Sequence, residues 1–255
     1  MLKILICILA GLGAGLGTGF AGMSAAAVIS PMLIAFLDMD PYMAVGIALA
    51  SDVLASAVSA VTYGRNKNLD VRNGLVMMAA VLCFTAVGSF VASIVPKTTM
   101  GNFSVIMTLL LGIKFIVKPV VAPKPCLTAA TTAQKIIRSL LGGALVGFIC
   151  GFVGAGGGMM MLLVLTSLLG YELKTAVGTS VFIMSVTALT GAVSHFAIGG
   201  LPDITALIVC VVSTLVFAQV AALFANRAQP KTLNRVTGAV LVVLGAAILI
   251  VNFCK

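Results

Sequence analysis

Two glycine-rich stretches, GLGAGLGTGFAGMSAA at residues 11–26 and GALVGFICGFVGAGGG at residues 143–158, decide the fold of this chain. In each stretch glycines recur every four residues within an apolar run, which places them on one helix face and favours close packing of membrane helices. The second stretch ends with four glycines in five positions. Because glycine is costly inside a helix and permissive outside one, each stretch predicts an apolar helix that ends at a break.

The two stretches are copies of one internal repeat. They coincide when the sequence is shifted by 132 residues, and Ala44–Gly46 then falls on Ala176–Gly178. Because ordered matches at one offset are uncommon by chance, we infer a duplication. Repeat 1 covers residues 1–121 and repeat 2 covers residues 135–255, and a proline-containing linker at residues 122–134 joins them.

Composition places the chain in a lipid bilayer. Only 8% of the residues are charged and 61% are hydrophobic, whereas about a quarter of a soluble domain is charged. The apolar runs are too long for the strands of a β-barrel. We therefore predict an all-α, polytopic integral membrane protein with two inverted-topology repeats of about five apolar segments each, giving eight to ten membrane helices. The segments are residues 2–18, 22–37, 42–63, 71–95 and 99–121 in repeat 1, and 136–152, 156–170, 174–197, 203–225 and 232–252 in repeat 2.

The segments differ in length. The last three of each repeat can span a bilayer, which takes roughly 20 residues. The first two are short, so they either cross or turn back at the glycine-rich break. The N-terminal run also resembles a secretory signal peptide, but its copy in mid-chain argues against that alternative.

Several functional classes find no support in the sequence. The chain has one histidine and no C-x-x-C motif, so we predict no metal site and no cofactor. No G-x-x-x-x-G-K-[ST] sequence indicates ATP binding. The net charge of +9 is dispersed among the apolar segments. We therefore predict that the basic residues set the membrane topology and contact anionic lipid, and that the chain does not bind nucleic acid.

Lysine and arginine counts predict opposite orientations for the two repeats. The loop after the third segment is basic in repeat 1 only, and the loop after the fourth segment is the more basic one in repeat 2. By the positive-inside rule the linker is cytoplasmic, both termini are outside, and each repeat crosses an odd number of times. Inverted repeats are typical of secondary transporters. The residues counted are Arg65, Lys67, Arg72 and Lys97 in repeat 1, and Arg227, Lys231 and Arg235 in repeat 2.

The breaks are the predicted substrate site. A helix that restarts at a break presents unpaired N–H groups and a positive dipole end, which bind an anion without a charged side chain. We expect the break of repeat 1 to be less complete and to retain more helix, with Ser24 capping the restarted helix. Nearby hydroxyls extend the site, although ordinary hydrogen bonding within helices explains them equally well. The predicted substrate-binding residues are Ser24, Ala25, Gly154, Gly156, Gly157, Gly158, Ser51, Thr179 and Ser180.

One acidic residue, Asp52, lies in the middle of an apolar segment. A carboxylate at this depth is expensive in lipid, so it should face a cavity or a partner. Two roles compete. Asp52 is either a proton carrier that couples transport to a proton gradient or a structural acid bonded to a neighbouring helix, and we favour the first because an ionised carboxylate would repel an anionic substrate.

These motifs resemble the TauE/SafE family of membrane transporters, also called sulfite exporters. The resemblance covers nearly the whole chain and is carried best by repeat 2, where residues 147–158 look like the family's G-x-x-x-G-x-x-G-x-G-G-G element and residues 176–180 look like A-V-G-T-S. Repeat 1 departs from the pattern, with Ser24–Ala26 in place of a glycine triplet and Gly46–Ala48 in place of G-T-S. Membership implies a bacterial inner-membrane permease for sulfur-containing anions.

The sequence therefore predicts a secondary permease or exporter, not an enzyme. Its expected substrate is a small anion, of the sulfite, thiosulfate or sulfonate class, that binds at the two breaks while the repeats rock to give alternating access. Two alternatives remain: a transporter of a different small solute, or a membrane enzyme or assembly factor, although no nucleophile–base constellation supports an enzyme. The sequence gives no oligomeric state.

Overall fold

The computed structural model describes residues 1–92, 113, 116–117, 131–153, 157–199 and 202–229, and scattered residues between 231 and 250. The continuous parts of this range contain eight helices and no strand, so the predicted all-α class is confirmed there. Most of the predicted fifth segment of repeat 1 and most of the linker lie outside the described residues, and the predicted fifth segment of repeat 2 is described only at scattered residues.

The described helices follow the predicted segments closely. The exceptions are α1 and α7, which are 20 and 22 residues long and are therefore not the short segments that we expected. By contrast, α2 and α8 are short, with 12 and 11 residues. The helices are α1 (Leu2–Ala21), α2 (Ala26–Leu37), α3 (Pro41–Arg65), α4 (Val71–Ala92), α7 (Thr132–Val153), α8 (Gly157–Ser167), α9 (Leu173–Gly199) and α10 (Ile204–Arg227).

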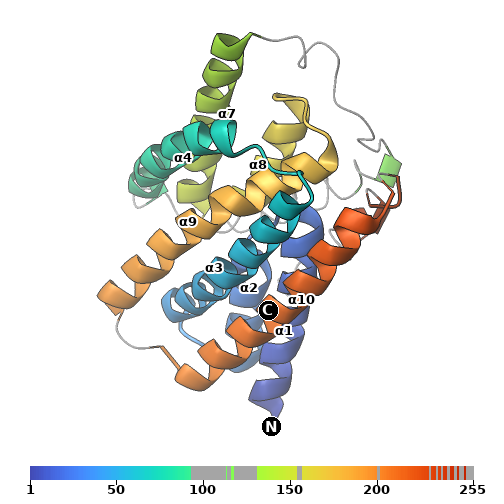
Figure 1. The fold of residues 1–255 in the computed structure, drawn as a ribbon. Helices are drawn as coiled ribbons and strands as arrows, with labels where there is room; N and C mark the ends of the chain where they lie inside the picture. Colours follow the sequence, from blue (N-terminus) through green and yellow to red (C-terminus); the bar gives the residue numbers. More distant parts are fainter. Residues whose placement is uncertain are drawn as a thin grey trace.

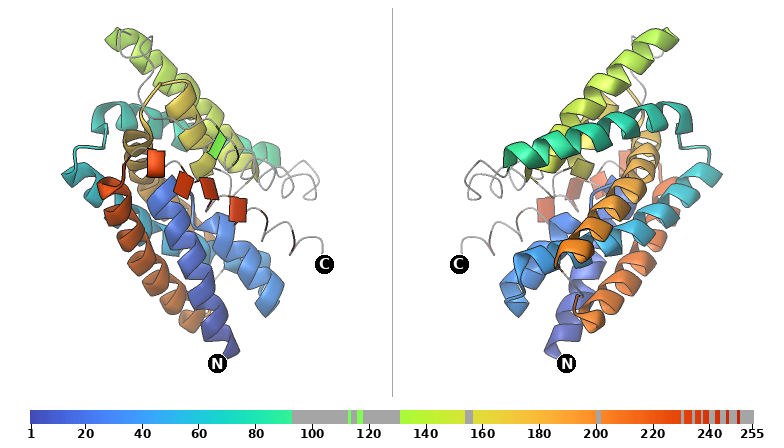
Figure 2. Two further views of the ribbon diagram at one scale, coloured as in Figure 1. Left: turned by 90° about the vertical axis from the view of Figure 1, so that its right-hand side faces the viewer. Right: turned by 90° about the vertical axis from the view of Figure 1, so that its left-hand side faces the viewer.

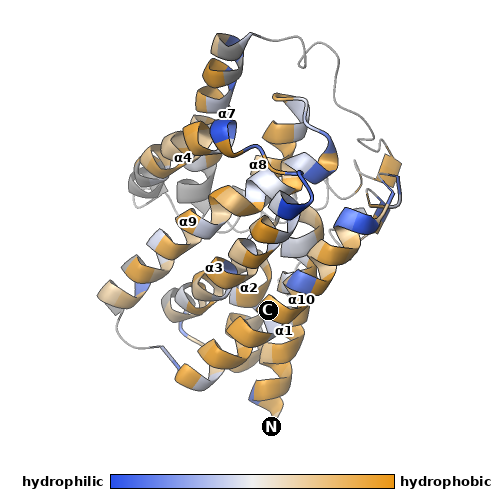
Figure 3. Ribbon diagram, in the orientation of Figure 1, coloured by the Kyte–Doolittle hydropathy of each residue, from blue (hydrophilic) through white to orange (hydrophobic). Residues whose placement is uncertain are grey.

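Four of the described helices, α1, α3, α9 and α10, are long and apolar enough to cross a membrane. Their outer surfaces suit lipid. On α10, large apolar side chains are exposed at every fourth position from Ile204 to Phe224, which forms one continuous face. Hydrophilic residues gather instead at the ends of helices, most visibly between α3 and α4 and at the end of α10 (Figure 3). The structure is therefore that of a multi-pass membrane protein.

The glycine stripes bring helices of the two repeats into contact. Gly11, Gly15 and Gly19 of α1 face α10, and a Cβ atom placed on Gly15 would lie 2.7 Å from the carbonyl oxygen of Thr214. Gly143 and Gly147 of α7 face α4 in the same way. Under the offset of 132 residues α1 corresponds to α7, so each stripe packs on the other repeat. Figures 1 and 2 both show α1 beside α10 and α4 beside α7.

The third helices of the repeats cross reciprocally. A Cβ atom on Gly46, near the start of α3, would meet His195 and Phe196 near the end of α9. A Cβ atom on Gly178, near the start of α9, would meet Tyr63 near the end of α3. The two helices therefore run antiparallel. Both glycines belong to the repeated Ala-Val-Gly motif, so one motif makes the same kind of contact twice.

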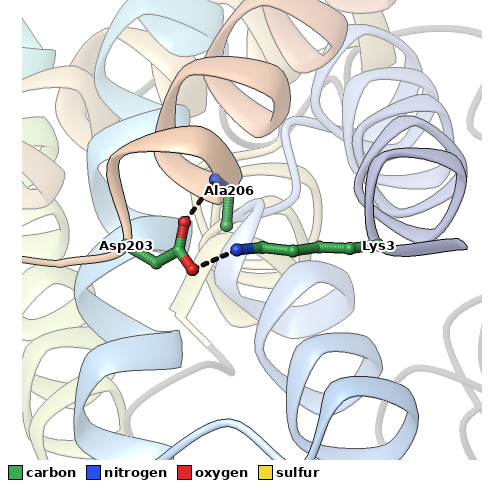
Figure 4. Close-up of polar contacts among 3 residues, drawn as sticks. All are labelled: Lys3, Asp203 and Ala206. Atoms are coloured by element: carbon green, nitrogen blue, oxygen red, sulfur yellow. Dashed lines mark hydrogen bonds and ion pairs between the residues drawn. The ribbon is translucent and has the colours of Figure 1, made fainter. Parts of the chain in front are cut away.

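An ion pair joins the start of α1 to the start of α10. Lys3 donates to Asp203, and Asp203 also accepts the backbone N–H of Ala206 at 3.1 Å, which makes it the N-cap of α10 (Figure 4). The hydrogen bond from Lys3, followed by that from Ala206, holds the pKa of the Asp203 carboxyl below its usual range. The carboxylate therefore has two separable roles, as a cap and as a partner for Lys3.

We expect Asp203→Ala to lower the thermal stability of the detergent-solubilised protein by about 1 kcal/mol, because the substitution removes the cap of α10. Lys3→Met should cost less, since the ion pair is exposed and screened. Because the pKa of Asp203 is lowered in the folded protein, the stabilisation by its ionised carboxylate is present at neutral pH and is lost as the pH falls below about 4. Thermal unfolding of wild type and both variants at pH 7 and at about pH 3 checks this, and equal losses for both variants at pH 7 would contradict it.

Candidate functional site

The helix of repeat 1 is fully interrupted at its break. That this break is less complete than the one in repeat 2 stays a prediction, because residues 154–156 lie outside the described residues. Helix α1 ends at Ala21 and α2 begins at Ala26. Gly22 adopts a left-handed conformation with φ 59°, and the N–H of Met23 donates to the carbonyl of Gly17. This pattern closes a helix sharply, and glycine takes that conformation with the least strain because it has no Cβ atom. The chain then turns back along α1 (Figure 2).

Hydroxyl groups donate to three backbone carbonyls at and just after the end of α1. The Tyr63 hydroxyl donates to Gly19 at 2.9 Å, and the Ser180 hydroxyl donates to Gly22 at 2.9 Å. The Thr18 hydroxyl donates to the carbonyl of Met23, also at 2.9 Å. Because these donors come from α3, α9 and α1, the break is held by both repeats.

Asp52 belongs to α3, and its side chain lies beside the start of α2. One carboxylate oxygen accepts the Ser24 hydroxyl at 2.8 Å and the other accepts the Ser56 hydroxyl at 2.7 Å. The backbone of Ala25 also hydrogen-bonds to this carboxylate. Ser24 in turn accepts the N–H of Ala26 at 3.3 Å, but the N-cap of α2 is Ala25, which makes no side-chain cap bond, so Ser24 lies one residue before the predicted capping position. The carboxylate therefore occupies the position at which a helix N-terminus would hold an anion.

The start of α8 touches the first break. Helix α8 begins at Gly157, and a Cβ atom on Gly158 would lie 2.6 Å from the Ser24 nitrogen and 2.7 Å from the Gly22 oxygen. Only a residue without a side chain fits this approach. A helix therefore starts again within the second glycine-rich stretch, as predicted, and its first residues lie directly against the first break. Gly154 and Gly156 lie outside the described residues.

The other predicted hydroxyls are fully buried but have different partners. Ser51 donates to the Ile47 carbonyl of its own helix at 2.8 Å, as the alternative of ordinary helix hydrogen bonding expects. Thr179 accepts the N–H of Asp70 at 3.2 Å, at the start of α4. Ser180 binds the first break rather than the second. The structure thus brings Ser24, Ala25, Asp52, Gly158 and Ser180 together and places Ser51 and Thr179 beside them with other bonds.

A polar cluster ties the loops of the two repeats together at one end of the molecule. The Tyr171 hydroxyl, between α8 and α9, donates to the Asp70 carboxylate at 2.6 Å. Asp70 also accepts the backbone N–H of Asn73 at 3.0 Å, which satisfies the start of α4. Burial and then the bond to Asp70 raise the pKa of the Tyr171 phenol, so it remains a donor at neutral pH. The cluster fixes the start of α4 against repeat 2.

Sequence reasoning missed several residues of the site. Ser56 could have been found, because it lies one helical turn after Asp52 on the same face. Tyr63 and Thr18 gave no such signal, since their partners are backbone carbonyls of a break whose position in space the sequence does not specify. Within the described residues, no group of three or more His, Cys, Asp or Glu side chains could hold a metal ion.

Comparisons with known proteins agree with this architecture. The family described as sulfite exporter TauE/SafE matches residues 7–248. The chain is 25% identical to the probable membrane transporter protein YunE of Bacillus subtilis (strain 168) over 268 residues, covering 97% of this chain and 98% of that protein. It is 24% identical to the probable membrane transporter protein YdhB of the same strain, over 89% of this chain and 90% of that protein. Because the family match takes in every described helix but the first residues of α1, this chain belongs to the TauE/SafE family of membrane transporters.

Proposed function

We propose that the chain is a secondary permease for a small anion of the sulfur oxyanion or organosulfonate class. The contact between the two breaks supports this proposal. Gly158 packs directly on the backbone of Gly22 and Ser24, so two helix N-termini converge at one place in the fold. Backbone N–H groups in such a place bind compact anions without a buried cationic side chain.

The two breaks differ in chemistry. At the first, the carboxylate of Asp52 already accepts hydrogen bonds from Ser24 and Ser56. Under the offset of 132 residues, Met184 stands at the equivalent position of repeat 2. The second break therefore has no acid of its own at that position. We assign the substrate anion to the amides of Gly156–Gly158, with Ser24 and Ala25 as the opposite wall.

Asp52 couples transport to protons in this proposal. Each of its oxygens meets a serine hydroxyl, and a hydroxyl can donate to a carboxylate or accept from a carboxylic acid. The cluster can therefore exist with or without the extra proton while keeping its hydrogen bonds. Protonation removes a charge that would repel an anion at the adjoining break.

Alternating access follows from the reciprocal packing of the repeats. Each repeat packs on the other through the helix pairs α1–α10 and α4–α7, and Gly158 of repeat 2 packs on the break of repeat 1. Rocking of these units about the breaks would expose the site to one side and then the other. We place the linker in the cytoplasm and both termini outside the inner membrane, on the basis of the lysine and arginine counts.

The test is a flux screen in proteoliposomes. The purified chain is reconstituted, and uptake of sulfite, thiosulfate, a small sulfonate and an uncharged solute of similar size is measured with and without a pH gradient. We expect saturable flux of at least one sulfur anion that the pH gradient accelerates. Flux of the uncharged solute alone would favour a different substrate class. No saturable flux of any of them would contradict the assignment as a permease for these anions.

A further inference from the structure

A stripe of buried polar side chains runs along one face of α3. Asp52, Ser56, Ser59 and Tyr63 are spaced four, three and four residues apart, which keeps them on the same side of the helix. All four are fully buried. At a rise of about 1.5 Å per residue the stripe is about 16 Å long. It ends two residues before Arg65, whose side chain is exposed at the end of α3.

Ser59 is the unusual member of this stripe. Its hydroxyl is buried and has no hydrogen-bond partner, whereas Ser56 binds Asp52 and Tyr63 binds the Gly19 carbonyl. A buried hydroxyl without a partner is costly, and one is retained where water or a function satisfies it. Ser59 lies between two polar neighbours on its own helix face, which is where a bridging water would complete its bonds.

Repeat 2 does not share the stripe. At the equivalent positions of α9 stand Met184, Ala188, Gly191 and His195, so only the last is polar. A Cβ atom on Gly191 would lie 2.9 Å from the side chain of Leu49. The apolar face of α9 packs well without hydroxyls, so packing alone does not require them on α3.

No charged side chain among the described residues bonds to Asp52. Helix α2, which follows Ser24, has no titratable residue. Four titratable side chains on the neighbouring helices α1, α9 and α10 bond to groups other than Asp52. They are Lys3, which bonds to Asp203; Cys210, to the Cys7 carbonyl; Lys174, to the Asn226 carbonyl; and His195, to the Gly191 carbonyl. Arg227 is the last residue of α10. The hydroxyls of the stripe are therefore the polar groups through which Asp52 can exchange a proton along α3.

We propose that Ser56 and Ser59, with Tyr63 at the end, form the proton route between Asp52 and the end of α3 at Arg65. This inference rests on the proposed proton coupling at Asp52. The chemistry balances without any further reactant: each hydroxyl, or a water between two of them, accepts a proton on a lone pair and releases its own. The proton moves from the Asp52 carboxyl to solvent, and each relay group is left as it began.

Ser59→Ala tests the route. The variant is reconstituted, and two rates are compared: flux driven by a pH gradient, and exchange of labelled for unlabelled anion, which needs no net proton movement. We expect the driven flux to fall at least about fivefold while exchange stays near the wild-type rate, because a proton-transfer group has been removed. Ser59→Thr, which keeps the hydroxyl, should restore most of the driven flux.

The matched control is Ser139→Ala on α7, which removes a buried hydroxyl that also has no partner but lies off the stripe. Thermal unfolding should show both alanine variants as stable as wild type, since neither loses a hydrogen bond between protein groups. Driven flux in Ser59→Ala equal to that of the control would overturn the route alone. If wild-type protein shows anion flux that ignores the pH gradient, proton coupling itself fails and the route fails with it.

Discussion

Asp52→Asn is expected to lower pH-driven anion flux at least about tenfold while anion binding and exchange persist. Asparagine keeps the size of the side chain and an oxygen that can accept from Ser24 or Ser56, but it cannot carry a proton. The first break should therefore stay in place while the coupling is lost. If Asp52 is instead a purely structural acid, driven flux and exchange should decline together.

The measurement compares driven flux, exchange and thermal stability in the same preparation. Asp38→Asn is the matched control, because this carboxylate is exposed beyond the end of α2, where a left-handed conformation with φ 47° suits asparagine. The control should behave as wild type. If the Asp52→Asn protein keeps an anion flux driven by the pH gradient at close to the wild-type rate, Asp52 is not the proton carrier.

Gly158→Ala should have the second large effect, through the contact between the breaks. The added methyl group would lie 2.6 Å from the Ser24 nitrogen and 2.9 Å from the Met23 Cα, and these backbone atoms cannot rotate away. Helix α8 must therefore shift from the first break. We expect a loss of thermal stability of about 1–3 kcal/mol and a loss of all anion flux, exchange included, because the binding site itself is displaced.

Gly64→Ala provides the control for this substitution. Gly64 is also a helical glycine, but its added methyl group would meet only the flexible end of the Leu69 side chain, at 3.3 Å. Its flux and stability should stay close to wild type. Binding of labelled sulfite or thiosulfate, with and without excess unlabelled anion, separates a lost site from a blocked movement. Normal anion affinity in Gly158→Ala would show that the junction of the breaks is not the binding site.

The sequence was sufficient for the parts of the structure that depend on periodicity. Apolar runs of spanning length predicted the helices, because lipid requires every backbone polar group to be bonded within its own segment. Glycines four apart predicted close packing, and the described stripes on α1 and α7 do pack against neighbouring helices. The length of α1 was misjudged because glycine was taken to end the segment at residue 18, whereas tight packing on α10 keeps Gly19 helical.

The site itself was predicted only in part. The four glycines near Gly158 and the isolated Asp52 stood out because both are costly in a membrane helix. Their partners did not. Ser180 is 158 residues from Gly22 in sequence, and Ser24 is 28 residues from Asp52, so nothing local joins either pair.

The sequence by itself determined that this chain is helical, lies in lipid, and ends α1 and begins α8 within its glycine-rich stretches, because these properties follow from composition and local backbone preference. Only the tertiary structure decided that α8 begins against the first break and that Asp52, rather than an outside anion, occupies the start of α2. The physical reason is that hydrogen bonds between distant segments depend on how the helices cross, and the crossing is set by which glycine faces meet.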